Sequence, residues 1–564
     1  MSSSKIQLTG LGLILGITLG LGGCSDNGSP DAADTLLSLV PRDTPYVFLV
    51  DKKAPEALSE RMIRATAQSL NQSIDEIPTQ GLDADARRLA GLARAIQAEL
   101  KDKMTLDGLR SVGIEPNGRF VAYGLGVLPV IRLQSNDPKQ AEALLARIEK
   151  RSGMQAEQRK HGDIAYRYFP FGKLSGVLAV HGGYLIAALL PAGGEEQLLP
   201  EIFGESRPEH PLAPADFEQF RQAHGFHGYG DGYLDLTRML ALSQGEATGI
   251  TAEAMKALHP DAAPTKPSPA CATFYRGLVA SVPRLSFGIA RASDTAYSTE
   301  IILDTAPGIA TILQGIPASV PDLDADGKAL LSARLGVNIP RLRDALNDLF
   351  RTFLEKGREC ESVDQAAITK AMQSLGLLLS PGISGIHGLA LAVNDVQLDA
   401  QTHQPIGIDA EALLAADDPR GLFSLVALVS PALAKLQVPS DGSPVALPLR
   451  DVAPMAPPTW VAMDDHALAL AVSAQKPTQL TAVLKSPPSD KAPFFAARFQ
   501  FDRMMEIAAP LLDAALQQAK GEDADELRQI RDSMKQSAEL YKSASFQIKA
   551  DQRGLVIHTD AEFK

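Results

Sequence analysis

The chain has 564 residues, of which 45% are hydrophobic and 21% are charged, with 38 prolines and 45 glycines. This composition excludes a disordered, collagen-like or low-complexity protein, and at about 150 residues per domain the length predicts two to four domains. The net charge is −13 and no cluster of lysine and arginine stands out. Nucleic acid is therefore not expected as a partner, and an acidic surface would be repelled by anionic lipid.

The first 23 residues have the pattern of a signal peptide. Lys5 is the single cation, and it precedes an apolar run over residues 6–21 that is too short to span a membrane comfortably. The end of the segment resembles a bacterial lipoprotein signal, because an aliphatic residue, two small residues and a cysteine form a lipobox: Leu21, Gly22, Gly23 and Cys24.

This resemblance implies that the peptide is cut before Cys24 and that Cys24 carries several acyl chains, enough for stable membrane anchoring. Ser25, the next residue, favours the outer membrane by the same resemblance. Residues 24–34 would then be the lipidated cysteine and a short polar tether, with the body in the periplasm or exposed at the surface. An ordinary secretory peptide is the alternative. No other stretch has eighteen apolar residues free of charges and breakers.

Two cysteines remain in the body, Cys271 and Cys360. An exported protein occupies a compartment that oxidises thiols, so a single disulfide between them is expected. Two free buried thiols are the alternative.

A β-like run that ends in an acid or amide and passes directly into a helical pattern occurs four times. We expect each of these polar residues to cap the helix that follows: Asp51, Asp235, Asn338 and Asp502. A longer correspondence supports a repeat, because the predicted hairpin over residues 178–189 aligns without gaps with residues 461–472. At the same offset, a helical stretch over residues 195–203 aligns with residues 478–486.

Each half then closes with a candidate hairpin, over residues 285–304 and 544–563. We interpret the chain as two homologous α+β lobes, residues 35–317 and 328–564, joined by an acidic linker over residues 318–327. Antiparallel sheets covered on one face by helices are expected, and coincidental alternation of short β patterns is the alternative.

The start of the body, residues 40–51, resembles the start of a bacterial envelope family known only as a domain of unknown function. The likeness extends loosely over the lobe plan and includes the last hairpin, residues 546–563. This family has no established activity, so the resemblance implies no catalytic residue.

Two groups of residues are candidates for metal binding. Asp322, Asp324 and Asp326 match the first half of an EF-hand calcium loop, but the acid required at position twelve falls on Ala333. A solvated acidic linker is therefore the preferred interpretation, with calcium as the alternative. The second group is a glycine-rich stretch with two imidazoles and a carboxylate but no third strong ligand at a characteristic spacing: His224, His227 and Asp231. No metal or other cofactor is expected.

The sequence contains no nucleophile elbow, Walker loop, His-Glu-x-x-His or paired-cysteine motif, so no catalytic residue is predicted. We expect a non-enzymatic outer-membrane lipoprotein, anchored at Cys24, that acts as a binding or scaffolding module in the cell envelope, with an envelope protein or a hydrophobic ligand as its partner. The alternatives are a carrier of hydrophobic ligands and an envelope hydrolase. Converging carboxylates or histidines in a cleft would favour the hydrolase, a dry apolar cavity the carrier, and a large exposed apolar patch without a pocket a protein partner.

Overall fold

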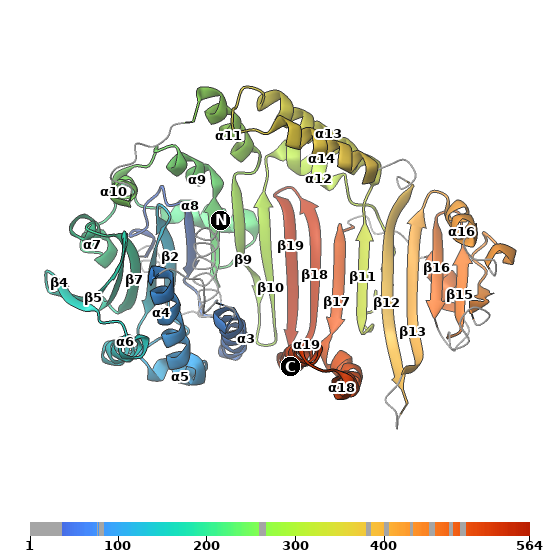
Figure 1. Ribbon diagram of the computed structural model, residues 1–564, viewed down its shortest axis with the longest axis horizontal. Helices are drawn as coiled ribbons and strands as arrows, with labels where there is room; N and C mark the ends of the chain where they lie inside the picture. The colour runs from blue at the N-terminus through green and yellow to red at the C-terminus, as the bar shows by residue number, and fades with distance from the viewer. Residues whose placement is uncertain are drawn as a thin grey trace. The chain divides into compact units, whose positions relative to one another are not determined.

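The structure is a computed structural model that describes residues 36–75, 77, 84–258, 267–378, 385–399, 405–428, 433–449, 457–472, 478–485 and 492–564. The chain divides into two compact units, unit 1 up to Asp304 and unit 2 from Thr305 to Lys564. Each unit contains helices and one antiparallel sheet, as an α+β protein should (Figure 1).

In the part of unit 1 that the structure describes there are ten strands: β1 (Tyr46–Val50), β2 (Phe120–Leu125), β3 (Leu128–Gln134), β4 (Glu157–His161), β5 (Ile164–Phe171), β6 (Leu174–His181), β7 (Tyr184–Pro191), β8 (Asp231–Asp235), β9 (Arg284–Ala292) and β10 (Ala296–Asp304). Their order across the sheet is β4-β5-β6-β7-β3-β2-β1-β8-β9-β10, and every neighbouring pair is antiparallel. The first strand of the unit therefore lies inside the sheet rather than at its edge.

The helices of unit 1 fill the connections between these strands: α3 (Glu56–Asp75), α4 (Ala84–Leu100), α5 (Leu106–Ser111), α6 (Pro138–Ser152), α7 (Glu195–Phe203), α8 (Pro214–His224), α9 (Leu236–Ser243), α10 (Gly249–Leu258) and α11 (Pro269–Ser281), with a 3₁₀ turn η1 (Lys101–Lys103). Helix α6 illustrates how the sequence sets their ends. Asp137 accepts hydrogen bonds from the backbone N–H groups of Lys139 and Gln140 at its start, and Gly153 ends it with a φ of 69°.

The sheet of unit 1 is buried on both faces at its centre. All six residues of β2 are buried, and alternate residues of a strand point to opposite faces. The ring of Phe48 on β1 packs against Phe120 on the neighbouring β2 and, across Gly232 of β8, against Phe287 on β9, with ring centroids 5.9 Å apart in each pair. The centre of this sheet is therefore covered on both faces.

The described residues of unit 2 form nine strands: β11 (Leu331–Gly336), β12 (Ile386–Leu398), β13 (Pro405–Ala416), β14 (Val445–Leu447), β15 (Thr459–Met463), β16 (Ala467–Val472), β17 (Phe495–Gln500), β18 (Tyr541–Asp551) and β19 (Gly554–Phe563). Their order is β14-β15-β16-β13-β12-β11-β17-β18-β19, again with antiparallel pairs throughout. The order β15-β16-β13-β12-β11-β17-β18-β19 matches β6-β7-β3-β2-β1-β8-β9-β10 of unit 1, strand for strand.

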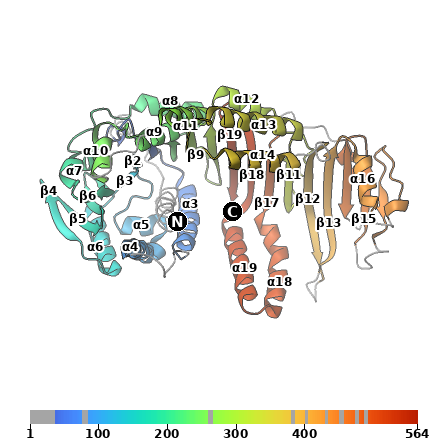
Figure 2. The same cartoon turned by 45° about the horizontal axis from the view of Figure 1, so that its top comes forward.

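The helices of unit 2 are α12 (Pro307–Gln314), α13 (Ile339–Lys356), α14 (Gln365–Leu378), α16 (Pro419–Leu428), α17 (Thr478–Leu484), α18 (Phe501–Gln518) and α19 (Glu522–Leu540), with a 3₁₀ turn η2 (Leu433–Lys435). Helices α18 and α19 lie side by side and project from the ends of β17 and β18 (Figure 2). Helix α12 contacts β18 and β19, so it belongs to unit 2, and the boundary falls before the one expected after Pro317.

The predicted elements agree closely with the structure, but only two of the four predicted helix caps are present. Asp235 accepts the backbone N–H of Arg238, and Asn338 accepts that of Arg341. Asp51 does not cap a helix, because α3 begins only at Glu56 and its carboxylate binds Arg221 instead. Asp502 lies inside α18, which begins at Phe501.

The lipobox residues Leu21, Gly22, Gly23 and Cys24, and the tether to residue 34, lie outside the described residues. Among the helices that the structure describes, none combines the length and the apolar character that crossing a bilayer requires. Cys271 in α11 and Cys360 in the turn after α13 form the predicted disulfide.

Candidate binding surface

One face of the unit 2 sheet is apolar across its central strands. Cross-strand partners point to the same side of a sheet, and Leu335 of β11 is paired with both Leu389 of β12 and Phe495 of β17. The pairing continues from Phe495 to Ile548 of β18. The apolar face is defined here by the residues on this side of β13, β12, β11, β17 and β18: Leu414, Ala412, Leu389, Leu391, Val393, Leu331, Ala333, Leu335, Phe495, Ala497, Phe499, Phe546 and Ile548.

Along β12 the burial is the reverse of the usual pattern. Leu389 and Leu391, on the apolar face, are 50% and 38% exposed, whereas Ala390 and Ala392, on the other face, are buried. Leu335 on the neighbouring strand is 47% exposed. The large apolar side chains therefore face solvent while the small ones are covered, although burying a leucine fully is worth about 1.5–3 kcal/mol.

The same face continues beyond the central strands. Strands β12 and β13 pair with each other past the ends of β11 and β16, and this two-stranded extension carries Ile406 and Ile408 on the apolar side, 68% and 39% exposed. At the β15–β16 margin, α16 covers the face, because its Phe423 packs in one cluster with Leu468 and Leu470. Leu425 and Leu428 of α16 remain exposed.

Helix α18 borders the apolar face at the end of β17. Phe499 of the face stacks on Phe501, the first residue of α18, with ring centroids 6.2 Å apart. Within the face, Phe495 and Phe546 on neighbouring strands contact each other at 6.1 Å. The aromatic side of β17 is thus joined to the helical hairpin that projects beside it.

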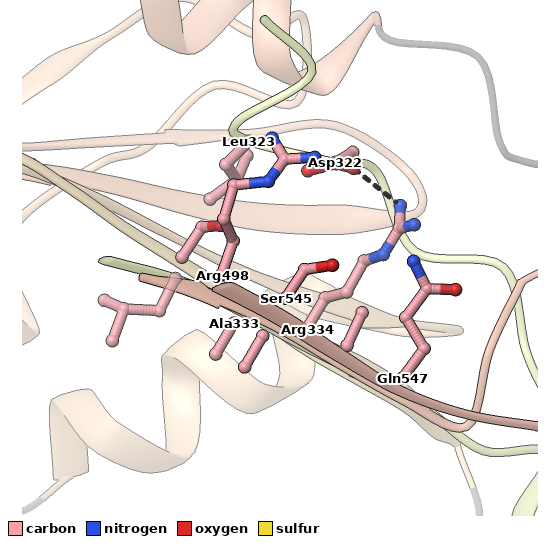
Figure 3. A pocket seen from close by; sticks show the side chains of 11 residues that line it. Asp322, Leu323, Ala333, Arg334, Arg498, Ser545 and Gln547 are labelled. Carbon is pink, nitrogen blue, oxygen red and sulfur yellow. Dashed lines mark ion pairs between the residues drawn. The ribbon is translucent and has the colours of Figure 1, made fainter. Parts of the chain in front are cut away.

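The opposite face of the same strands holds a polar niche. Arg334, Arg498, Ser545 and Gln547 stand on one side of the sheet, and Asp322 lies over them (Figure 3). The Arg334 guanidinium pairs with the Asp322 carboxylate at 3.2 Å. The niche has a volume of about 40 Å³, which is room for a few water molecules rather than for an organic ligand.

The three acids predicted as weak calcium ligands are each engaged by a cation. Asp322 pairs with Arg334, Asp326 with Lys328 at 2.8 Å, and the buried Asp324 with Arg498 at 3.3 Å. The Asp324 carboxylate also accepts the backbone N–H of Ala329 and the hydroxyl of Ser332. The segment around Asp324 is therefore not a solvated linker: the carboxylate fastens it to the sheet.

The second predicted metal group is divided between two clusters in unit 1. Arg221 donates two hydrogen bonds of 2.8 Å to Asp51 and one of 2.8 Å to Asp231, and all three side chains are buried. One oxygen of Asp231 has no hydrogen-bond partner among the described residues, and burial raises the pKa of Asp231 to about 6. His227 is exposed, so these side chains do not surround a common point.

His224 belongs to a second cluster. This cluster has the residue types of a catalytic triad, but its hydrogen bonds do not connect them in the order that a triad requires. Its Nε2 lies 3.0 Å from the Asp304 carboxylate and its Nδ1 lies 2.8 Å from the carbonyl oxygen of Phe220. The Ser286 hydroxyl donates to Asp304 at 2.7 Å rather than to the imidazole. A serine nucleophile needs the histidine as its hydrogen-bond partner, so this arrangement suits structural anchoring.

In the part of the chain that the structure describes, the one group of metal-ligand residues that come together is Cys271, Cys360 and Glu361. Both sulfurs are in the disulfide, and a metal would need them as thiolates. Comparison with protein-family models, with curated proteins and with solved structures found no match for this chain.

The apolar face is the candidate functional site, and its exposure was not part of the sequence-based expectation. The run Leu389-Ala390-Leu391-Ala392-Val393 is apolar at every position, which is typical of a strand buried on both faces. No local pattern indicates that the leucine side lacks a cover. Chemically, the face can bind an apolar surface, and the polar niche behind it fastens the segment around Asp324 to the sheet.

Proposed function

We propose that the protein is an outer-membrane lipoprotein that binds another envelope protein through the apolar face of unit 2. The observation that carries this proposal is the exposure of Leu335, Leu389 and Leu391 on two paired strands. Monomeric soluble proteins rarely leave contiguous apolar patches of more than a few hundred Å² uncovered, and larger ones mark interaction sites. A partner that covers these side chains would recover the free energy that the isolated chain forgoes.

The distribution of exposed large apolar side chains suggests that the two units have different roles. Of the thirteen large apolar residues that are exposed among the described ones, ten lie in unit 2. Unit 1 has a sheet buried on both faces at its centre. In this proposal unit 1 is the stable support and unit 2 carries the binding function.

We infer that the two units arose by duplication. The inference is supported by the matching order of eight strands and by the helices inserted at the same places, α3 and α4 between β1 and β2, and α13 and α14 between β11 and β12. The ungapped alignment of β6–β7 with β15–β16 points the same way. Loss of helical cover in one copy would turn a core face into a binding face.

The membrane anchor in this proposal is Cys24, supported by the lipobox that precedes it. Acylation at this residue would hold the body close to the outer membrane, where an envelope partner is within reach. The Cys24→Ser variant should leave the membrane fraction, and the intact mass of the wild-type chain should include the acyl groups. A wild-type chain found without acyl groups would refute the anchor but would leave the binding face untested.

Crosslinking in intact cells tests the binding function. Replacing Leu389 by photoreactive benzoylphenylalanine places the probe at the centre of the apolar face. Illumination should then give one dominant adduct with an envelope protein. The matched control is the same replacement at Val127, which is 40% exposed in the β2–β3 turn of unit 1 and lies outside the face. Identical adduct patterns at the two positions would argue against a specific binding face.

A further inference from the structure

The part of the apolar face where its five strands lie side by side is small compared with a full protein–protein interface. The strands β13, β12, β11, β17 and β18, each about 4.8 Å wide, together cover about 24 Å, and the six residues of β11 and of β17 limit this part to a length of about 20 Å. The resulting area of about 480 Å² is below the roughly 800 Å² per partner of a standard interface. It does match a helix of about 16–18 residues, which is about 24–27 Å long and about 10 Å wide.

The border of this face is acidic. The α18–α19 hairpin, residues 501–540, contains nine acidic and five basic residues, a net charge of −4 in 40 residues, whereas the whole chain carries −13 in 564. This hairpin starts at Phe501, in contact with Phe499 of the apolar face. Charge is thus concentrated about fourfold beside the apolar face, and the field there attracts a cationic partner.

We propose that the occupant of the apolar face is a basic amphipathic helix of a partner protein, with its apolar stripe on Leu335, Leu389 and Leu391 and its lysine and arginine side chains toward the α18–α19 hairpin. This inference rests on the proposed function, since it names the class of partner that the same face binds. The binding mode is a helix laid on an apolar surface, in which residues at i, i+3, i+4 and i+7 are the anchors.

Charge decides against two other occupants. A second copy of this chain would bring a second acidic hairpin and a net charge of −13 toward the same face. An anionic lipid surface would be repelled for the same reason. A basic amphipathic helix would be stabilised both by apolar contact with the face and by attraction to the acidic hairpin. It therefore fits the exposed apolar face and its acidic border together.

The test measures binding of synthetic 18-residue peptides to the purified full chain by fluorescence anisotropy. The probe peptide has leucine at i, i+3, i+4 and i+7 positions and lysine elsewhere; one control has glutamate in place of lysine, and another has the same composition without the periodicity. We expect the lysine peptide to bind at least tenfold more tightly than either control, with affinity that falls as salt rises. The Leu389→Asp variant should weaken binding at least tenfold, and Val127→Asp should leave it unchanged.

Equal binding of the lysine and glutamate peptides, or full binding by Leu389→Asp, would overturn the inference. A concentration-dependent dimer that Leu389→Asp abolishes would overturn it in favour of a second copy, and Leu389-dependent binding to anionic vesicles would overturn it in favour of lipid. If the peptide fails while Leu389 still crosslinks to an envelope protein, the basic-helix inference fails and the proposed function stands. If both fail, the proposed function falls as well.

Discussion

Leu389 and Ala390 are neighbours on β12, yet the leucine is 50% exposed and the alanine is 1% exposed. Ala390 lies in a buried cluster with Val320 and Leu413 on the covered side of the sheet. The alanine side of β12 therefore packs in the core of unit 2, and the leucine side is exposed and can contact another molecule. This inversion is the physical basis of the proposal that unit 2 binds a partner.

Replacing each of these neighbours by aspartate should have opposite consequences for stability. Leu389→Asp places a charge in solvent and should change the free energy of unfolding by about 0.5 kcal/mol or less. Ala390→Asp forces a larger, charged side chain into a buried cluster beside Arg334 and should cost about 2–3 kcal/mol. Chemical denaturation of the two variants measures the difference. Similar losses for both would mean that the apolar face is part of a covered core.

The raised pKa of Asp231 should make the free energy of unfolding depend on pH. Burial raises its pKa to about 6 in the folded chain, above the value of about 3.9 for an unfolded one, although Arg221 opposes this shift. The folded state therefore holds the proton more tightly, and the stabilisation is fully present below pH 4 and is lost as pH rises through 6.

The Asp231→Asn variant removes this titration while keeping an oxygen for the backbone N–H of Gly228. Relative to the variant, the wild type should lose on the order of 2 kcal/mol of unfolding free energy between pH 4 and pH 6.5. Urea denaturation of both proteins across this range gives the difference directly. A difference that stays flat, or that grows in favour of the wild type with rising pH, would contradict the burial of this carboxyl group.

We expect Asp324 to stabilise the folded chain and not to bind calcium. Asp324→Ala leaves the backbone N–H of Ala329, the Ser332 hydroxyl and Arg498 without their shared acceptor, at a cost of about 2–3 kcal/mol. The exposed neighbour Asp326 is the control, and Asp326→Ala should leave the Tm unchanged. Millimolar calcium should not shift the Tm of the wild type, because each of the three carboxylates already pairs with a cation. A calcium-induced rise that Asp324→Ala abolishes would restore the metal interpretation.

The disulfide between Cys271 and Cys360 should contribute strongly to stability, since it closes a loop of about 90 residues and is worth about 4–5 kcal/mol in the chain-entropy model. The Cys271→Ser, Cys360→Ser double variant should therefore unfold at lower denaturant concentration than the oxidised wild type. Alkylation before reduction should label neither cysteine, as mass spectrometry can establish. Labelling of both in protein from oxidising cells would contradict the pairing.

Local patterns allowed most of the elements to be predicted, because their ends are set by nearby residues. The cap residues Asp235 and Asn338 act on helices that start at the next residue, so the sequence contains the whole interaction. Asp51 has the same local pattern, but its partner Arg221 is 170 residues away in the chain. No local pattern reveals that ion pair, so the helix cap predicted at Asp51 is wrong.

The candidate site was beyond sequence reasoning for a similar reason. Whether Leu389 is covered depends on where α16 and α18 end relative to the sheet, which is a tertiary property. The acids around Asp324 suggested a calcium loop or a solvated linker, but Asp324 is a buried anchor. Alternating carboxylates occur in both metal-binding loops and buried anchors, so the local pattern does not distinguish them. The distinguishing fact is Arg498, which lies on a strand 174 residues further along the chain.

The most direct test of the central claim is the accessibility of the apolar face in the cell. The Leu389→Cys variant, with its other cysteines in the disulfide or at the proposed lipid anchor, offers a single reactive thiol for maleimide labelling. Val127→Cys provides a matched position outside the face. The account predicts that position 389 labels rapidly in the purified chain and at least tenfold more slowly in intact envelopes, while position 127 labels equally in both. Equal labelling of position 389 in the two preparations would show that nothing covers the face and would contradict the account.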